Sequence, residues 1–377
     1  MDLNSKSSLP SPCYVCEEKL LEKNLQLLQY VQEEANVKIL LALKGFAMFS
    51  TFELCKKYLK GCCASGLNEA ILAKEEFGLE VHTYSPAFKP NEFDEIVKIS
   101  NHIVFNSFNQ FELYKNKVTS KNSIGIRVNP EVSTVDVDLY NPCGTYSRLG
   151  TTKENFPTTL PSQIEGLHFH ALCEQNVDAL ELVLVKFEEN FGKYFSQLRW
   201  LNFGGGHHIT RADYDIEKLI SVLKNIKNKY PHLTIYLEPG EAVGWRTGYL
   251  EATVLDIVDN GMDIAILDTS AECHMPDTLA MPYRADIRGA DEAFKKEYTY
   301  KLGGNTCLAG DIIGDYSFDV PLKVGDKIIL EDMIHYTMVK TTTFNGINLP
   351  SIAIKKINGE FQVVRNYDYA SYKDRLS

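Results

Sequence analysis

Four short segments of the sequence each follow a run of apolar residues, and each carries a group that can do chemistry. Lys44 lies in the first, His170 in the second, Gly204–Gly206 form the third, and Glu238 stands in the fourth. A lysine amine can form an imine with an aldehyde, and glycine N–H groups can approach a phosphate closely. A carboxylate can keep an aromatic ring nitrogen protonated, while an imidazole lies flat on the ring. Together these groups predict a site for pyridoxal 5'-phosphate.

Each segment alone also has an ordinary explanation. Lys44 could be a solvated lysine that opens a loop, the glycine triplet could be a flexible turn, and Glu238 could stand in a surface turn. Their shared position after apolar runs favours function, because desolvation there would lower the pKa of Lys44 and favour imine formation.

Metal binding is a competing use of the histidines. His168 and His170 share one face of a predicted strand, and His207 and His208 are adjacent. Neither pair has a third ligand at a suitable spacing, so we expect no metal site.

The composition is that of an ordinary globular protein of 377 residues with a formal net charge of −11. This charge argues against a nucleic-acid partner and permits a cationic substrate. No stretch approaches the roughly 20 apolar residues that span a bilayer, and residues 1–12 lack the apolar core of a signal peptide. The nine cysteines are irregularly spaced, as expected for reduced thiols. We therefore expect a cytoplasmic protein without a membrane partner.

Apolar runs alternate with helical patterns over residues 38–240, which predicts a (β/α)8 barrel. One such pattern starts at Ile216, with Asp213 as the expected N-cap. A doubly wound sheet is the alternative, but a barrel gathers the ends of all its strands at one mouth. The eight runs are Lys38–Leu43, Gly61–Ala64, Glu80–Tyr84, His102–Asn106, Ser123–Asn129, Ile164–Ala171, Leu198–Phe203 and Leu233–Leu237.

Beyond about residue 247 the pattern changes to short strands separated by Gly, Asn and Asp turns, with Tyr336–Val339 among the expected strands. We therefore expect a barrel over residues 17–246 and an all-β domain over 247–377, to which residues 1–16 could be added.

Beyond these patterns, the sequence resembles the pyridoxal phosphate-dependent basic amino-acid decarboxylases of the alanine-racemase-like fold (fold type III). The resemblance runs from Pro12 almost to Tyr372. Within that family, Gly166–Glu174 and Cys273–Asp277 resemble the members that decarboxylate carboxynorspermidine or carboxyspermidine. The resemblance implies a homodimer in which each subunit consists of a barrel and a β domain, and the active sites are shared between the two subunits.

The resemblance assigns roles residue by residue. Lys44 carries the cofactor, His170 stacks on its ring, and Glu238 meets the ring nitrogen. Cys307 matches a catalytic cysteine delivered across the dimer interface. Asp311, which follows it where relatives keep an acidic residue, is a further candidate for binding the substrate. The remaining cofactor contacts implied are Arg127, Gly204, Gly205, Gly206, Gly240 and Tyr336.

Two departures from the family pattern bear on the substrate. Cys173 stands close to where relatives have a phosphate-binding serine, which leaves that contact open. Glu241 replaces the arginine that helps diaminopimelate decarboxylases hold a distal carboxylate. An anion in place of a cation favours a distal amine, so we expect Glu241 and Asp277 to bind the amine end of a carboxylated polyamine.

The leading hypothesis is decarboxylation of carboxynorspermidine or carboxyspermidine to norspermidine or spermidine. The alternatives are diaminopimelate decarboxylation and a non-catalytic regulator of polyamine metabolism. A regulator should have lost Lys44 or Cys307, and both are present.

Overall fold

The computed structural model describes residues 9–135 and 137–377. It divides into two compact units, Glu22–Val243 and the residues up to Leu21 together with Gly244–Ser377. The first division falls inside helix α1 (Glu18–Ala35) and the second inside α8 (Glu241–Gly244). Neither division is marked by a loop linker.

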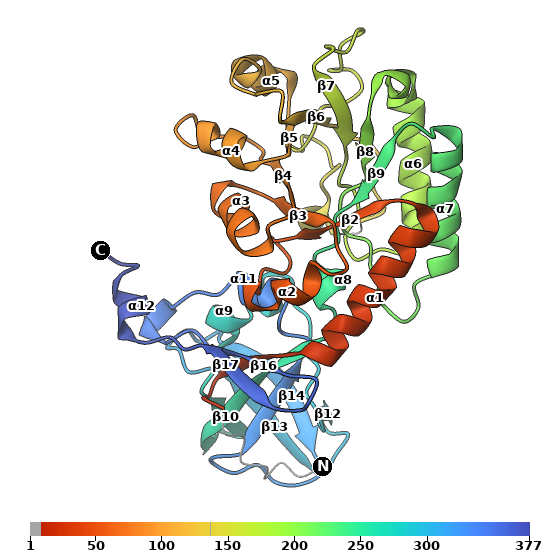
Figure 1. Ribbon diagram of the computed structural model, residues 1–377. Coiled ribbons are helices and arrows are strands. Elements are labelled where there is room, and N and C mark those ends of the chain that lie inside the picture. Colours follow the sequence, from red (N-terminus) through yellow and green to blue (C-terminus); the bar gives the residue numbers. More distant parts are fainter. Residues whose placement is uncertain (1–8, 136) are drawn as a thin grey trace. The chain divides into compact units, whose positions relative to one another are not determined.

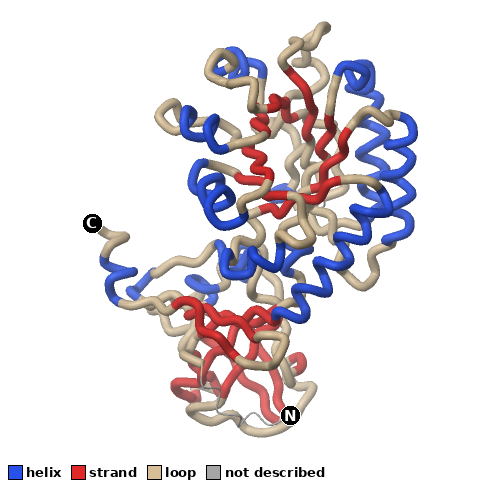
Figure 2. The backbone as a smooth tube through the Cα atoms, viewed as in Figure 1, coloured by secondary structure: helices blue, strands red, loops and turns tan. Residues whose placement is uncertain are grey.

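The first unit is a closed barrel of eight parallel strands in sequence order (Figures 1 and 2). It closes where β2 pairs with β9, with Lys38 opposite Tyr236. This confirms the predicted barrel and excludes the doubly wound sheet. The strands are β2 Lys38–Ala42, β3 Gly61–Ala64, β4 Glu80–Tyr84, β5 His102–Phe105, β6 Ser123–Arg127, β7 Ile164–His168, β8 Trp200–Asn202 and β9 Thr234–Leu237.

Helices alternate with these strands except between β6 and β7, where the described residues contain only a 3-10 turn. The N-cap of α7 is Asp215, whose side chain accepts from the Lys218 N–H. The prediction of Asp213 was wrong, because Asp213 instead pairs with Arg211 at 2.6 Å. The helices are α2 Phe52–Cys55, α3 Leu67–Leu72 with a π-helical continuation Ala73–Phe77, α4 Phe93–Ile99, α5 Phe108–Tyr114, α6 Val177–Phe191 and α7 Ile216–Lys229; 3-10 turns cover Phe49–Thr51, Asp138–Tyr140 and Gly192–Gln197.

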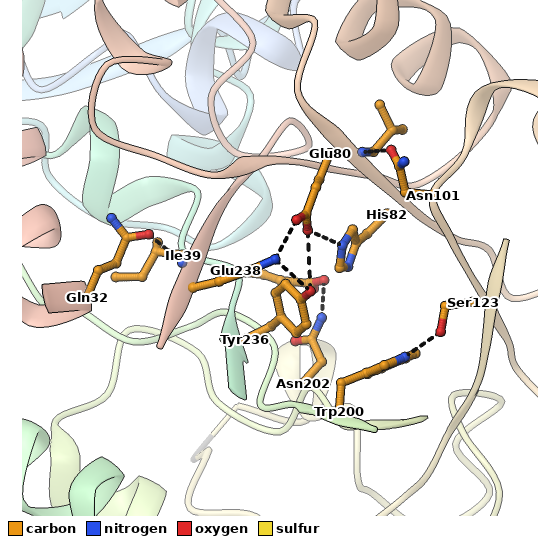
Figure 3. Close-up of polar contacts among 12 residues, drawn as sticks. Gln32, Ile39, Glu80, His82, Asn101, Ser123, Trp200, Asn202, Tyr236 and Glu238 are labelled. Atoms are coloured by element: carbon orange, nitrogen blue, oxygen red, sulfur yellow. Dashed lines mark hydrogen bonds and ion pairs between the residues drawn. The ribbon is translucent and has the colours of Figure 1, made fainter. Parts of the chain in front are cut away.

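A buried Trp200 side chain fills part of the barrel interior. It packs with Leu40, Val104 and Tyr236, and its indole N–H donates to Ser123 Oγ at 2.8 Å (Figure 3). A large ring at this place needs neighbours without side chains.

Glycines on the two preceding strands provide that room. A Cβ on Gly166 would lie 2.0 Å from the Trp200 ring, and one on Gly125 would lie 2.3 Å from it.

We predict that Gly166→Ala lowers the free energy of unfolding by about 1–3 kcal/mol or more, because the added methyl overpacks the ring. Urea denaturation measures this. Gly66→Ala is the matched control, since a Cβ there meets nothing within 4 Å. Equal stability of the two variants would contradict this packing.

The second unit is built around a nine-stranded mixed sheet, in the order β12-β14-β13-β11-β10-β1-β16-β17, with β15 paired to β10. The N-terminal strand β1 pairs antiparallel with β10 and parallel with β16. The strands are β1 Cys13–Glu17, β10 Gly248–Asp259, β11 Asp263–Leu267, β12 Asp291–Glu292, β13 Tyr298–Gly303, β14 Ile312–Phe318, β15 Lys327–Glu331, β16 Ser351–Lys355 and β17 Phe361–Arg365.

Short helices interrupt this sheet. Tyr336–Val339 is helix α11, so the predicted strand there was wrong. A four-residue apolar pattern fits a strand or one helical turn equally well. The others are α9 Ala271–His274, α10 Asp277–Ala280 and α12 Tyr369–Lys373, with a 3-10 turn at Phe344–Gly346. Among the described residues, no helix combines the length and apolarity needed to cross a membrane.

Candidate active site

The predicted site residues divide between the two units. Those of the barrel unit stand at or just beyond the carboxyl ends of β2, β6, β7, β8 and β9, which meet at one mouth of the barrel. They are Lys44, Arg127, His170, Gly204–Gly206, Glu238, Gly240 and Glu241. The second unit carries Asp277, Cys307, Asp311 and Tyr336.

Glu238 is held in one orientation by two side chains from neighbouring strands. The Asn202 amide donates to Oε1 at 2.6 Å (Figure 3), and His168 Nε2 lies 3.4 Å from Oε2. Burial acts to raise the pKa of Glu238, but these neighbours lower the pKa to about 2. The barrel therefore presents a fixed, ionised carboxylate, which is what a protonated ring nitrogen requires.

The proton positions on His170 follow from its two hydrogen bonds. The Gly205 N–H donates to Nδ1 at 2.9 Å, and Lys44 Nζ lies 3.3 Å from Nε2. Burial lowers the pKa of His170 well below 6.5, and the nearby charge of Arg127 acts in the same direction. A neutral imidazole that accepts at Nδ1 carries its proton on Nε2, so Nε2 donates to Lys44.

Lys44 then has to accept that hydrogen bond with its nitrogen lone pair, which requires the neutral amine. Burial, and after it the charge of Arg127, lowers the pKa of Lys44 and so favours the neutral form. The side chain is nevertheless open to solvent, so water in the mouth offsets part of the effect. A neutral amine is the nucleophilic form of lysine.

The three glycines are required by packing inside the loop. Gly204 and Gly206 have φ values of +66° and +83°, and a Cβ on Gly205 would lie 2.3 Å from the Glu238 carbonyl oxygen. The N–H of Gly204 donates to Asn202 Oδ1 and that of Gly205 to His170. Two of the three N–H groups predicted to cradle a phosphate are thus committed to side chains that orient the site.

Arg127 and Gly240 hold loops at the mouth of the barrel in place. Arg127 is buried, its Nη2 donates to the His170 carbonyl at 3.2 Å, and its guanidinium lies over the Tyr84 ring at 4.6 Å. A Cβ on Gly240 would lie 2.9 Å from the Ala42 carbonyl oxygen. Both residues therefore fix loops that carry the reactive groups.

In the second unit, the Asp311 carboxylate is buried and serves its own loop. Oδ1 accepts from the N–H groups of Ala271 and Glu272, and Oδ2 accepts from the N–H and hydroxyl of Thr306. Because both oxygens already accept hydrogen bonds, this carboxylate is better suited to hold the loop that carries Cys307 than to contact a substrate.

Cys307 itself is exposed, and its N–H donates to Asn345 at 2.8 Å. Asp277 pairs with Lys340 at 2.6 Å. Tyr336 is the first residue of α11 and lies beneath the Lys340 ammonium, 5.5 Å from the ring centroid.

Sequence reasoning missed several residues of the site. Asn202 and His168 orient Glu238, and two groups, Glu80–His82–His102 and Glu174–His208–Glu241, could hold a metal ion. Glu80 and His82 lie two residues apart on β4, but His102 comes from β5, and the three members of the second group come from three different loops, so sequence spacing reveals neither group. In the first group, the rings of His82 and His102 stack in parallel at 3.8 Å, so their in-plane lone pairs do not converge on one ion.

Comparison with known proteins places this geometry in a family. The family model described as "Pyridoxal-dependent decarboxylase, C-terminal sheet domain" matches residues 13–334. The chain belongs to the pyridoxal-dependent decarboxylases. It is thus a carboxy-lyase that uses pyridoxal phosphate, and the neutral Lys44, the imidazole of His170 and the ionised Glu238 fit that cofactor.

Individual relatives are similar over almost the whole chain. A carboxynorspermidine/carboxyspermidine decarboxylase of Campylobacter jejuni is 52% identical, with 97% of this chain and 98% of that protein covered. A carboxyaminopropylagmatine decarboxylase of Synechocystis is 47% identical over 98% of this chain and 96% of its own length. The crystal structure of Campylobacter jejuni carboxynorspermidine decarboxylase complexed with norspermidine has a TM-score of 0.92 at 51% identity, covering 97% and 100% of the two chains.

Diaminopimelate decarboxylase is a more distant relative. The enzyme of Haemophilus influenzae is 28% identical over 54% of this chain and 53% of its own. That alternative hypothesis therefore loses its support.

Buried neutral histidines predict how stability depends on pH. Burial lowers the pKa of His102 to about 2 and that of His207 to about 4, whereas both return to about 6.5 in the unfolded chain. Because the unfolded state binds these protons first, their stabilising contribution is complete above about pH 6.5 and is lost as the pH falls.

We predict that each histidine costs up to about 1.4 kcal/mol of stability per pH unit below pH 6.5. Urea denaturation between pH 7.5 and 4.5 measures the slope, and His207→Gln should reduce it. Stability that stays level down to pH 5 would contradict the assignment.

Proposed function

We propose that this chain decarboxylates carboxynorspermidine and carboxyspermidine to norspermidine and spermidine in polyamine biosynthesis. The proposal is supported by relatives of that name and, above all, by the position of Glu241. A Cβ on Gly45, the neighbour of Lys44, would lie 3.0 Å from the Glu241 backbone nitrogen. Glu241 is therefore attached beside the lysine that carries the cofactor, and its side chain is largely buried.

The barrel residues prepare the reaction. When bound, pyridoxal phosphate would supply an electron-accepting ring for the electron pair left at Cα when carbon dioxide departs. Glu238 would hold the proton on the ring nitrogen, and neutral His170 would pack against the ring without adding charge. Lys44 would supply the amine that holds the cofactor aldehyde. Among the triplet, we assign phosphate binding to the Gly206 N–H, with Gly240 and Tyr336 as further contacts.

Protonation of Cα then completes the exchange of carbon dioxide for a proton. We assign this proton to the Cys307 thiol, which belongs to a partner subunit in a homodimer with shared sites. We further propose a cytoplasmic location, because all nine cysteines are free thiols, as is usual in a reducing compartment.

The substrate assignment predicts the behaviour of Glu241→Gln, which keeps the shape and removes the charge. A charge-assisted hydrogen bond of about 1.5–3 kcal/mol would be lost, so kcat/KM for carboxynorspermidine should fall about 10- to 150-fold. Carbon dioxide release is measured with carboxynorspermidine, carboxyspermidine, meso-diaminopimelate, ornithine and arginine. The short substrate ornithine should be affected least, and a uniform loss across the panel would return Glu241 to a structural role.

The shared site predicts complementation between two inactive variants. Neither Lys44→Ala nor Cys307→Ala should be efficient alone. After random subunit exchange, half of the dimers are mixed and each contains one intact site, so about a quarter of the sites should recover. Exchange shown by mass spectrometry without any recovered activity would place Cys307 in its own subunit's site or outside the reaction.

A further inference from the structure

Three loops of the second unit are joined by hydrogen bonds at and next to His274. The first loop follows β11 and runs through α9 to Asp277, the second joins β13 to β14 and carries Cys307, and the third is the segment 342–348. Of the motif Cys273–Asp277, only Asp277 takes part in the proposed function. His274 is fully buried, and its contacts show what else the motif does.

The imidazole of His274 joins the first loop to the third. Its Nε2 lies 3.1 Å from the Asn348 carbonyl oxygen, which can only accept, so Nε2 carries a proton and donates. Nδ1 lies 2.9 Å from the Thr269 hydroxyl. Burial lowers the pKa of His274 to about 4, so the ring is neutral at neutral pH and Nδ1 accepts from Thr269. Both ring nitrogens are thus used, and the tautomer is fixed.

The backbone of His274 is anchored to the mixed sheet. Its carbonyl accepts from the Tyr14 hydroxyl, and its N–H donates to the Ser270 carbonyl at 3.0 Å. Tyr14 is only 1% exposed and lies on β1, which has a neighbouring strand on each side. The ring of His274 therefore starts from a fixed point of the sheet.

The third loop connects His274 to Cys307. The Thr342 N–H donates to the Cys273 carbonyl at 2.9 Å, and the Asn345 side chain accepts from the Cys307 N–H at 2.8 Å. Asn345 has φ +57°, a left-handed conformation that asparagine adopts more readily than most residues. The turn at Asn345 therefore sets where the Cys307 backbone is held.

We propose that His274 is a positioning residue for Cys307. Its neutral ring, oriented by Thr269, fixes the third loop at the Asn348 carbonyl, and the Asn345 side chain of that loop holds the Cys307 backbone. Cys307 is exposed, so its thiol depends on the backbone for its place. A displacement of about 1 Å in a group that takes part in a reaction can cost about a hundredfold in rate. The inference rests on the proposed role of Cys307 as proton donor.

Two variants of the holoenzyme break the connection at different points. His274→Asn leaves a side chain too short to reach the Asn348 carbonyl, and Asn345→Gly removes the amide while keeping the left-handed turn. In both, backbone hydrogen exchange at Cys307, measured by mass spectrometry with fragmentation, should be at least about tenfold faster, because its N–H is held less well. For carboxynorspermidine, kcat should fall about 10- to 100-fold, with KM changed by less than about threefold.

A double-mutant cycle tests whether His274 acts through Cys307. In the Cys307→Ala background, His274→Asn should lower kcat by less than about a further threefold, because the residue that it positions is already absent. A full additional loss would overturn the proposal, since His274 would then act on another part of the site or on stability alone.

Two further histidine variants serve as controls. His274→Gln places an N–H donor near the position of Nε2 and should restore most of the slow exchange and of kcat. His232→Asn is the matched control in the barrel unit. His232 Nε2 lies 3.0 Å from the Phe195 carbonyl oxygen, so the same type of bond is lost, and both measurements should stay at their wild-type values.

Hydrogen exchange separates this proposal from the proposed function. Faster exchange at Cys307 in both variants, with Cys307→Ala fully active, supports the connection from His274 and refutes only the role of Cys307 as proton donor. Unchanged exchange in His274→Asn overturns the proposal at any level of activity. If His274→Asn does not fold, Thr269→Val keeps the shape and removes the hydroxyl that orients the ring, and unchanged exchange there overturns it equally.

Discussion

The backbone N–H of Gly205 donates to Nδ1 of His170, and the proton arrangement of the site depends on this bond. It places the imidazole proton on Nε2, so that Lys44 faces a donor, which favours the neutral form of the amine. The same loop begins with Gly204, whose N–H holds the Asn202 oxygen. The Asn202 amide is thereby turned towards Glu238. One glycine loop thus sets a neutral base on one side of the mouth and a fixed anion on the other.

The charge states of Lys44 and Glu238 depend on the same two effects, burial and the neighbouring polar groups, but with opposite results. Burial disfavours charge on both Lys44 and Glu238. Lys44 also faces the positive charge of Arg127, which adds to the effect of burial. Glu238 instead faces His168 and receives a hydrogen bond from Asn202, and these neighbours together outweigh the effect of burial on its pKa. Hydrogen-bond donors directed at one group and cations near the other therefore decide which is charged.

The barrel, and the position of the candidate cofactor groups at its mouth, could be predicted from sequence because both are encoded locally. An apolar strand such as Lys38–Ala42 followed by a polar residue places that residue at the mouth of a barrel, whatever the distant partners are. The orientation of Glu238 could not be predicted, since Asn202 precedes it by a whole helix and gives no signal beyond one polar residue in an apolar run. The acceptors of the Gly204 and Gly205 N–H groups could not be predicted for the same reason, because they are side chains brought in by folding. The strand predicted at Tyr336–Val339 was wrong because four residues are too few to distinguish the two-residue period of a strand from the 3.6-residue period of a helix.

The loops after β7, β8 and β9 also suggest why a barrel suits a long cationic substrate. Each strand end carries a group that we propose for the cofactor, and each loop carries a further polar group three or four residues on. Pairs such as Leu167 with Leu201 and Leu201 with Ile235 fix the register of the neighbouring parallel strands. The groups that follow the strands therefore begin at matching levels of the barrel. A change in an outer residue can therefore alter what the far end of a substrate meets without moving the residues that hold the ring. Replacement of an arginine by Glu241 is a change of this kind. In the proposed function it reverses the charge offered to the substrate, while Glu238, three residues earlier, is held by Asn202 and His168.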